Sequence, residues 1–319
     1  MTDIAFYCVA DERYFPGVVA MLNSLRLQGH DEAVFVLDCG LSRRQREQLG
    51  PEVTIVERPD AAAPWMQKTY APLQHPARVM ILIDADIIIT RPLNELIELT
   101  NADRIVAFRN DREIHFPEWG DLLDLGPTRP GPYVSSGLVA MAAEPGLDLL
   151  RLWEDRKDWI DPARSYFGTN EPGYEFPFLD QDVFNAILRT RVEPDQLVAL
   201  EHRLAANPPF NGLRIADLRS LRCRHHDGVE PFLLHHFNRK PWQARLRSNV
   251  YSRLLTRLLL ADDAPIRLEP GQLPRRLRIG AAASADRGVT DLVMIGPGIA
   301  RRLKERRRRP SPEATQSGA

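Results

Sequence analysis

The first hundred residues alternate short apolar segments with segments of helical periodicity, and this alternation limits the fold more than any other feature of the chain. The apolar segments are rich in β-branched and aromatic residues and predict buried strands over 4–9, 33–37, 53–56, 79–83 and 105–108. The intervening segments predict helices over 16–29, 43–49 and 92–99. Such alternation favours parallel strands with helices on both faces of the sheet. We therefore expect an α/β fold with a Rossmann-like mixed, mainly parallel sheet.

The second half of the chain is less regular. Strands are predicted over 133–141 and 232–237, and helices over 146–159, 180–188 and 244–260. Two long segments rich in proline and glycine, 109–132 and 161–178, are typical of loops near a functional site. Beyond residue 262 the periodicity weakens. We expect one domain over 1–262, followed over 263–319 by a linker and a basic C-terminal tail.

Composition and charge exclude several classes of protein. The formal net charge is −1, which argues against nucleic-acid binding. Residues 301–309, however, hold seven basic residues and one acid, and this segment could bind an anionic membrane surface. Cys8, Cys39 and Cys223 are widely spaced and indicate neither a disulfide framework nor a zinc site. We recognise no signal peptide and no membrane-spanning segment, and therefore expect a cytoplasmic protein.

Two carboxylates follow the most apolar of the predicted strands. Asp84 and Asp86 come directly after 79–83 and are separated by Ala85. In open α/β sheets, ligands bind beyond the carboxyl ends of the strands, so both side chains are expected at a binding site. Paired carboxylates suit a divalent cation such as Mg²⁺ or Mn²⁺, which can neutralise a diphosphate. Because a D-x-D pair alone is weakly specific, a merely solvated strand end remains the alternative.

Six short motifs occur in order along residues 4–245. They are Val9–Tyr14 followed by Ser24-Leu25, Lys68 sixteen residues before Asp84, Asp84-Ala85-Asp86, Tyr133–Leu138, Asp180-Gln181-Asp182 with Asn185, and His235–Trp242. Together they resemble glycosyltransferase family 8, the retaining enzymes that include glycogenin and bacterial lipopolysaccharide galactosyl- and glucosyltransferases. The resemblance implies the GT-A fold of that family.

The resemblance also implies residues that bind a nucleotide-sugar and a metal ion. The donor would be bound at the ends of several predicted strands, by Ala10, Asp11, Tyr14, Lys68, Asp84 and Lys240. The metal ion would be held by Asp84, Asp86 and one of two adjacent histidines. His236 is followed by phenylalanine, as in the family motif, whereas His235 has the better spacing to Lys240. Of the two histidines we favour His236.

Catalytic roles are implied for the D-Q-D motif. Gln181 and Asp180 would lie near the anomeric carbon, where the Gln181 carbonyl dipole would stabilise an oxocarbenium-like state and Asp180 would bind sugar hydroxyls. Further substrate contacts are expected from Ser135, Ser136, Gly137 and Asp182. Asp182 and Asn185 could instead cap or brace the helix that they begin. The chain departs from the family at Ser135, where asparagine is usual, and in its closing motif, which is shorter and lacks a glycine.

The sequence thus predicts a metal-dependent glycosyltransferase with a UDP-sugar as donor, Mn²⁺ or Mg²⁺ as cofactor, and a saccharide, lipid-linked or protein acceptor. The resemblance implies retention of configuration, a role in polysaccharide or lipopolysaccharide synthesis, and attachment of the basic tail to the inner face of the membrane. One alternative is an inactive sugar-nucleotide-binding protein on the same fold. Another is a haloacid-dehalogenase-like phosphatase, but its D-x-D motif normally lies near the N-terminus.

Overall fold

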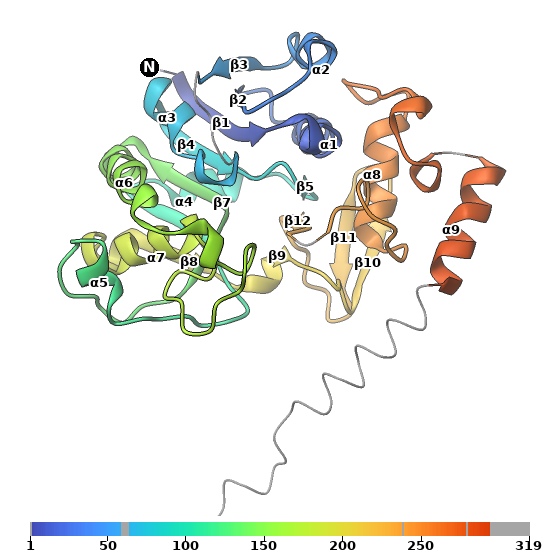
Figure 1. Ribbon diagram of the computed structural model, residues 1–319. Helices are drawn as coiled ribbons and strands as arrows, with labels where there is room; N and C mark the ends of the chain where they lie inside the picture. The colour runs from blue at the N-terminus through green and yellow to red at the C-terminus, as the bar shows by residue number, and fades with distance from the viewer. Residues whose placement is uncertain (1, 59–63, 238, 279, 294–319) are drawn as a thin grey trace, which may run out of the picture.

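The structure, a computed structural model, describes residues 2–58, 64–237, 239–278 and 280–293. Within them a central sheet of seven strands has the order β3-β2-β1-β4-β7-β6-β8 (Figure 1). Its pairings are parallel except that β7 runs antiparallel to β4 and β6. The strands are β1 (Thr2–Ala10), β2 (Ala33–Asp38), β3 (Thr54–Glu57), β4 (Ala77–Ile83), β6 (Ile105–Arg109), β7 (Val134–Ala142) and β8 (Leu197–Leu200).

Side-chain alternation along the strands builds a separate core on each face of the sheet. In β1, Phe6 and Cys8 enter one core, and Ala5 and Tyr7 enter the other. The first face is covered by α1 (Phe15–Leu27), α2 (Arg43–Leu49), α4 (Asn94–Leu99) and α8 (Val250–Leu260). The second is covered by α3 (Tyr70–Gln74), α5 (Trp119–Leu122), α6 (Ala143–Arg156) and α7 (Asp180–Arg191). The expected mainly parallel sheet with helices on both faces is confirmed.

A smaller sheet brings a distant part of the chain to the end of β4. It consists of β5 (Ile87–Ile89), β12 (Leu233–His235) and β9 (Ala205–Ala206). In the antiparallel β5–β12 pair, His235 lies opposite Ile87. Beside this sheet, β10 (Leu213–Asp217) and β11 (Arg222–His225) form a hairpin (Figure 1). The pairing of β12 with β5 therefore places the closing motif next to the two aspartates.

The described part of the segment beyond residue 262, which we expected to be a linker, packs against the domain. Ile266, Leu268 and Leu277 are buried in the same core as α1 and α8. The side chain of Asn23 bonds to Leu258 O and to both backbone groups of Ile266. The chain continues into α9 (Ala281–Val293). No helix in the described ranges is long and apolar enough to cross a bilayer, and the basic tail lies outside them.

Candidate active site

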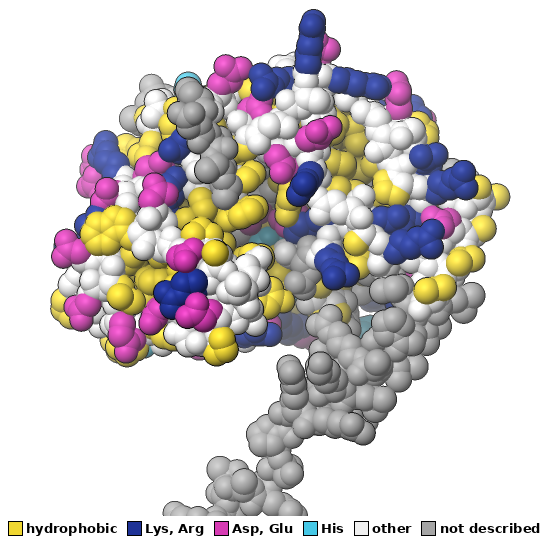
Figure 2. All heavy atoms as spheres, viewed as in Figure 1, with side chains coloured by type: hydrophobic (Ala, Val, Ile, Leu, Met, Phe, Trp, Pro, Cys, Tyr) yellow, Lys and Arg dark blue, Asp and Glu magenta, His cyan; other side chains and the backbone are white. Residues whose placement is uncertain are grey.

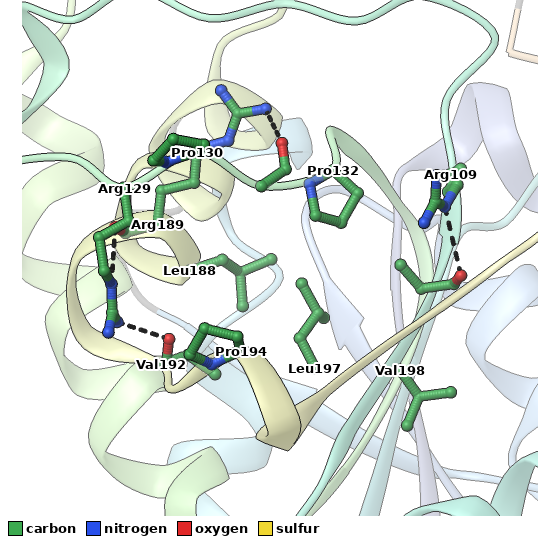
Figure 3. A pocket seen from close by; sticks show the side chains of 12 residues that line it. Arg109, Arg129, Pro130, Pro132, Leu188, Arg189, Val192, Pro194, Leu197 and Val198 are labelled. Carbon is green, nitrogen blue, oxygen red and sulfur yellow. Dashed lines mark hydrogen bonds between the residues drawn. The ribbon is translucent and has the colours of Figure 1, made fainter.

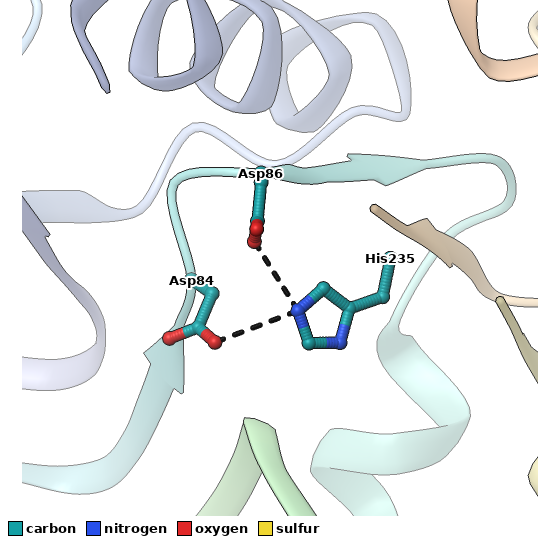
Figure 4. Close-up of side chains that lie close together, drawn as sticks. All are labelled: Asp84, Asp86 and His235. Carbon is teal, nitrogen blue, oxygen red and sulfur yellow. Dashed lines mark ion pairs between the residues drawn. The ribbon is translucent and has the colours of Figure 1, made fainter. Parts of the chain in front are cut away.

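Asp84 and Asp86 lie where β4 ends, at the edge of the sheet that the sequence predicted. The N–H of Asp84 donates to Gly137 O on β7 at 2.8 Å, and the N–H of Ile87 donates back to Asp84 O at 3.2 Å. This tight turn directs both carboxylates toward one point (Figure 4). The Asp84 side chain is partly exposed, whereas that of Asp86 is buried.

The imidazole of His235 completes a three-residue cluster with these carboxylates. His235 Nε2 lies 3.2 Å from Asp86 Oδ1 and 3.6 Å from Asp84 Oδ2 (Figure 4). One ligand atom from each residue falls within 4.8 Å of the others. Asp86 Oδ1 is buried, and apart from His235 Nε2 it has no hydrogen-bond partner among the described residues, so it keeps coordinating capacity. Two carboxylate oxygens and one imidazole nitrogen fit a divalent cation.

The structure brings His235, and not the favoured His236, together with the two aspartates. Consecutive side chains of an extended segment point in opposite directions, so His236 faces away from the aspartates. Its ring packs against Tyr251, with centroids 4.9 Å apart, and against Phe210 at 5.8 Å. Burial, with the nearby positive charge of Lys240, lowers the pKa of His236 to about 4. His236 is therefore packed between aromatic side chains beside the site.

Two glycines let backbone segments approach the cluster closely. A Cβ on Gly137 would lie 2.5 Å from Cε1 and 2.7 Å from Nδ1 of His235. A Cβ on Gly17 in α1 would overlap both Ala85 O and the ring of Trp242. Gly137, which the sequence assigned to substrate contact, thus makes room for the imidazole.

Lys68 and Lys240 bring positive charge to the carboxylates. Lys240 is buried and pairs with Asp86, and together with His235 it outweighs burial and lowers the pKa of Asp86. Lys68 Nζ lies 2.8 Å from Asp84 Oδ1 and 3.5 Å from Asp180 Oδ2. Burial opposes its charge, but these two carboxylates raise the pKa of Lys68. Both lysines therefore lie within the predicted site.

The D-Q-D motif lies at the start of α7, on the other side of Lys68. Burial raises the pKa of Asp180 to about 6 despite the opposing charge of Lys68. Lys68 Nζ also donates to Ser136, through its backbone oxygen at 3.3 Å and its hydroxyl at 3.1 Å. Ser136 N–H in turn donates to Gln181 Oε1 at 3.2 Å. Lys68 and Ser136 therefore connect the aspartate cluster with the residues expected near the sugar.

Asp182, Asn185 and Ser135 have contacts within the protein. Asn185 Oδ1 accepts from Val134 N–H and its Nδ2 donates to Val134 O, both at 2.8 Å, as a neighbouring strand would. Asp182 is fully buried and accepts from Phe178 N–H at 2.5 Å. Ser135 Oγ accepts from Gly137 N–H at 3.2 Å. The bracing role considered for Asp182 and Asn185 is thus what their contacts show.

The residues expected to meet the nucleotide lie at the carboxyl end of β1, beside that of β4. Ala10 ends the strand and is buried. The Asp11 side chain accepts from Tyr14 N–H at 2.9 Å and caps the 3₁₀ helix Glu12–Tyr14. The ring of Tyr14 lies 5.5 Å from Lys240 Nζ and 6.3 Å from the ring of Trp242. These residues border the same site.

Figure 2 shows a hollow in the face of the molecule seen in Figure 1, with a histidine side chain visible inside it. A separate cavity of about 480 Å³ lies between the loop 109–132, the end of α7 and β8 (Figure 3). Arg129 donates to Val192 O at 2.7 Å, and Arg189 donates to Gly131 O at 2.5 Å. These arginines tie the loop to α7. The described residues that line the cavity include no carboxylate, so it is not part of the aspartate site.

Sequence reasoning missed Tyr133 and Tyr251, whose buried hydroxyls bond to groups of the site. Tyr251 donates to Asp86 O at 3.0 Å, and Tyr133 contacts Gln181 and Asp182. Tyr133 stands at the start of a recognised motif, but its partners are 48 and 49 residues away. Only the packing of α7 on β7 brings these groups together.

The same arrangement of strands and helices occurs in solved glycosyltransferases. An active-site mutant of LgtC is 17% identical, with a TM-score of 0.52 over 80% of this chain and 94% of LgtC. The galactosyltransferase LgtC in complex with donor and acceptor sugar analogs is 15% identical, with a TM-score of 0.51 over 81% and 98%. The chain has the GT-A glycosyltransferase fold.

A third similar structure, the glycosyltransferase GlyE of Streptococcus pneumoniae TIGR4, is 14% identical, with a TM-score of 0.52. The match covers 82% of this chain and 61% of GlyE. No protein-family model and no curated protein matches the sequence. At these identities the likeness establishes the fold, and function rests on the site.

Proposed function

We propose that this chain is a metal-dependent glycosyltransferase of the family 8 type, which transfers a sugar from a nucleotide-sugar to an acceptor. The observation that carries the proposal is the convergence of Asp84, Asp86 and His235 at the carboxyl edge of a GT-A sheet. Lys68 and Lys240 pair with its carboxylates, and Gln181 is linked to Lys68 through Ser136, which supports the proposal. A UDP-sugar is the proposed donor and Mn²⁺ or Mg²⁺ the proposed ion.

A cation bound by Asp84, Asp86 and His235 would supply positive charge to the leaving diphosphate. Lys68 and Lys240 would add further charge, because each can exchange its carboxylate partner for a phosphate oxygen. Gln181 Oε1, bonded to Ser136 N–H, keeps a second lone pair with which to stabilise positive charge at the anomeric carbon.

Asp180 is the proposed acceptor of hydrogen bonds from sugar hydroxyls. Its Oδ2 is buried and forms no hydrogen bond with the described residues, although Lys68 Nζ lies 3.5 Å away. A carboxylate oxygen in this state gains from a hydroxyl partner, since an unpaired buried acceptor is costly. We propose retention of configuration on the strength of the family resemblance.

UDP release tests the proposal directly. The wild-type chain is incubated with Mn²⁺ and a panel of UDP-sugars, with and without EDTA. We expect Mn²⁺-dependent release that Asp86→Ala abolishes. Asp3→Ala is the matched control, because Asp3 is an exposed aspartate paired with Arg78, which lies at the opposite end of β4 from Asp84. Absence of release with every donor would contradict the proposal.

A second candidate is a protein that binds a sugar-nucleotide without turnover. The departures at Ser135 and in the closing motif favour it, because groups expected to contact the donor are replaced or missing. Thermal stabilisation by UDP with Mn²⁺, combined with no UDP release, would support this alternative.

We also propose, from the charge of the basic segment 301–309, that this segment attaches the chain to an anionic membrane. From the family resemblance we propose that this occurs at the cytoplasmic face and that the enzyme serves lipopolysaccharide or polysaccharide synthesis. Its test compares sedimentation of the full chain and of a chain ending at residue 293 with phosphatidylglycerol vesicles. Equal sedimentation would refute it.

A further inference from the structure

A buried hydrogen-bond chain runs from the interior of the protein to the Gln181 amide. Tyr133 and Asp182 are both fully buried. The Tyr133 hydroxyl lies 2.5 Å from Asp182 Oδ1, and Gln181 Nε2 lies 2.8 Å from the Tyr133 oxygen. Tyr133 is shielded from solvent, so it can act on the reaction only through Gln181.

The chemistry of these groups fixes the direction of each bond. Burial raises the pKa of Asp182 to about 7, and in its ionised form this carboxylate only accepts, so the Tyr133 O–H donates to it. Because the single hydroxyl proton of Tyr133 is donated to Asp182, the Tyr133 oxygen can only accept a second hydrogen bond. Its other neighbour, the Gln181 amide, must therefore supply an N–H donor. The side of the Gln181 amide that faces Tyr133 must therefore be the NH₂ group.

The opposite end of the amide is fixed independently. Ser136 N–H is a backbone donor, and it lies 3.2 Å from Gln181 Oε1. A flipped amide would place two donors against each other at Ser136. The backbone of α7 is held as well, because Asn185 Nδ2 donates to Gln181 O at 2.8 Å. The contacts at the NH₂ end and at the carbonyl end of the Gln181 amide are therefore both satisfied by the same orientation of the amide group.

We propose that Tyr133 is a positioning residue that, oriented by Asp182, holds the carbonyl of Gln181 toward the reacting sugar. This inference rests on the proposed function for its consequence in catalysis, although the orientation itself is a property of the chain. Tyr133 fixes the amide before substrate binds, so the carbonyl dipole needs no reorganisation during the reaction.

Tyr133→Phe removes one oxygen atom and tests the proposal. We expect kcat to fall about ten-fold, the usual scale for one lost hydrogen bond, with less than a three-fold change in KM for the donor. Tyr7→Phe is the matched control: Tyr7 is a buried tyrosine whose hydroxyl donates to His75 O at 2.6 Å, away from α7. Tyr7→Phe should lower the melting temperature comparably and leave kcat unchanged.

Asp182→Asn tests the direction of the bonds with almost no change in volume. Because Phe178 N–H needs an acceptor, the new amide would turn its NH₂ toward Tyr133, whose proton would then be directed at Gln181. We expect a similar loss of kcat. In the Tyr133→Phe background the same change should cost little more, since both act through one chain. Multiplicative losses would overturn the proposal.

The NMR signals of the Gln181 side-chain amide give a readout independent of turnover. They are assigned by their disappearance in Gln181→Glu. We expect slow solvent exchange of these protons in the wild type and in Tyr7→Phe, and at least ten-fold faster exchange in Tyr133→Phe. These exchange rates can be measured even if the chain turns over no donor. A failure of the proposed function can therefore be distinguished from a failure of the proposed role of Tyr133. Unchanged exchange together with unchanged kcat in Tyr133→Phe would refute the role of Tyr133.

Discussion

A side chain introduced at residue 137 should cause a measurable loss of metal affinity, because it would displace the His235 imidazole. In Gly137→Ala the new methyl carbon would lie 2.5 Å from His235 Cε1, against an ordinary carbon–carbon contact of about 3.5 Å. The imidazole must therefore move by roughly 1 Å, and disturbing the orientation of a metal ligand can cost up to about 100-fold in metal affinity. We expect a loss of Mn²⁺ affinity of this order, equivalent to about 2.7 kcal/mol.

Isothermal titration of Mn²⁺ into wild type and Gly137→Ala measures the effect. Gly271→Ala is the control, because a Cβ there meets nothing within 4 Å among the described residues. In a His235→Ala background, Gly137→Ala should cause no further loss, since the displaced ring is absent. Equal affinity of Gly137→Ala and wild type would refute the reasoning, as would an undiminished loss in the His235→Ala background.

Two further predictions concern stability. Burial raises the pKa of Asp180 to about 6, against the effect of Lys68, so the folded chain binds the proton of this carboxyl group more tightly than the unfolded chain. The stability that the protonated group contributes is therefore lost as pH rises from about 4 through 6. Relative to wild type, Asp180→Asn should thus gain up to about 3 kcal/mol in free energy of unfolding between pH 4 and pH 7 by urea titration; a constant difference would contradict this. Asn185→Ala leaves both backbone groups of Val134 unpaired and should lower the free energy of unfolding by about 2–3 kcal/mol, whereas an unchanged urea midpoint would exclude this bracing role.

The sequence was most informative where local chemistry determines structure. The helix predicted over 43–49 has these bounds in the structure, where Ser42 caps it and forms a capping box with Gln45. The predicted start of the last long helix at residue 244 was early, because Asn249 caps α8 and sets its first residue at Val250. The strands β5, β8, β9, β10 and β11 were missed. They are short, and β8 and β10 are only partly buried, so the periodicity is weak.

The parts of the site that the sequence did not predict are those that depend on how distant strands and helices pair and pack. The spacing of Asp84 and Asp86 after an apolar strand was enough to place both carboxylates at the sheet edge. The choice between His235 and His236 depends on the register in which β12 pairs with β5, because a shift of one residue would exchange the faces on which the two side chains lie. Likewise, the contact of Tyr133 with α7 exists only once the helix has docked.

Gly17 gives one wall of the site a fixed shape. At this glycine α1, the turn between the two aspartates and Trp242 touch without an intervening side chain, and the Trp242 indole N–H is anchored on Arg13 O at 2.8 Å. Gly17 and Ala85 meet backbone to backbone, and the indole that packs against them is held by its own hydrogen bond, so this wall has little freedom to yield to an incoming ligand. Adaptation to donors of different size would therefore fall to Lys68, Ser136 and Gln181, whose contacts with one another involve movable side chains.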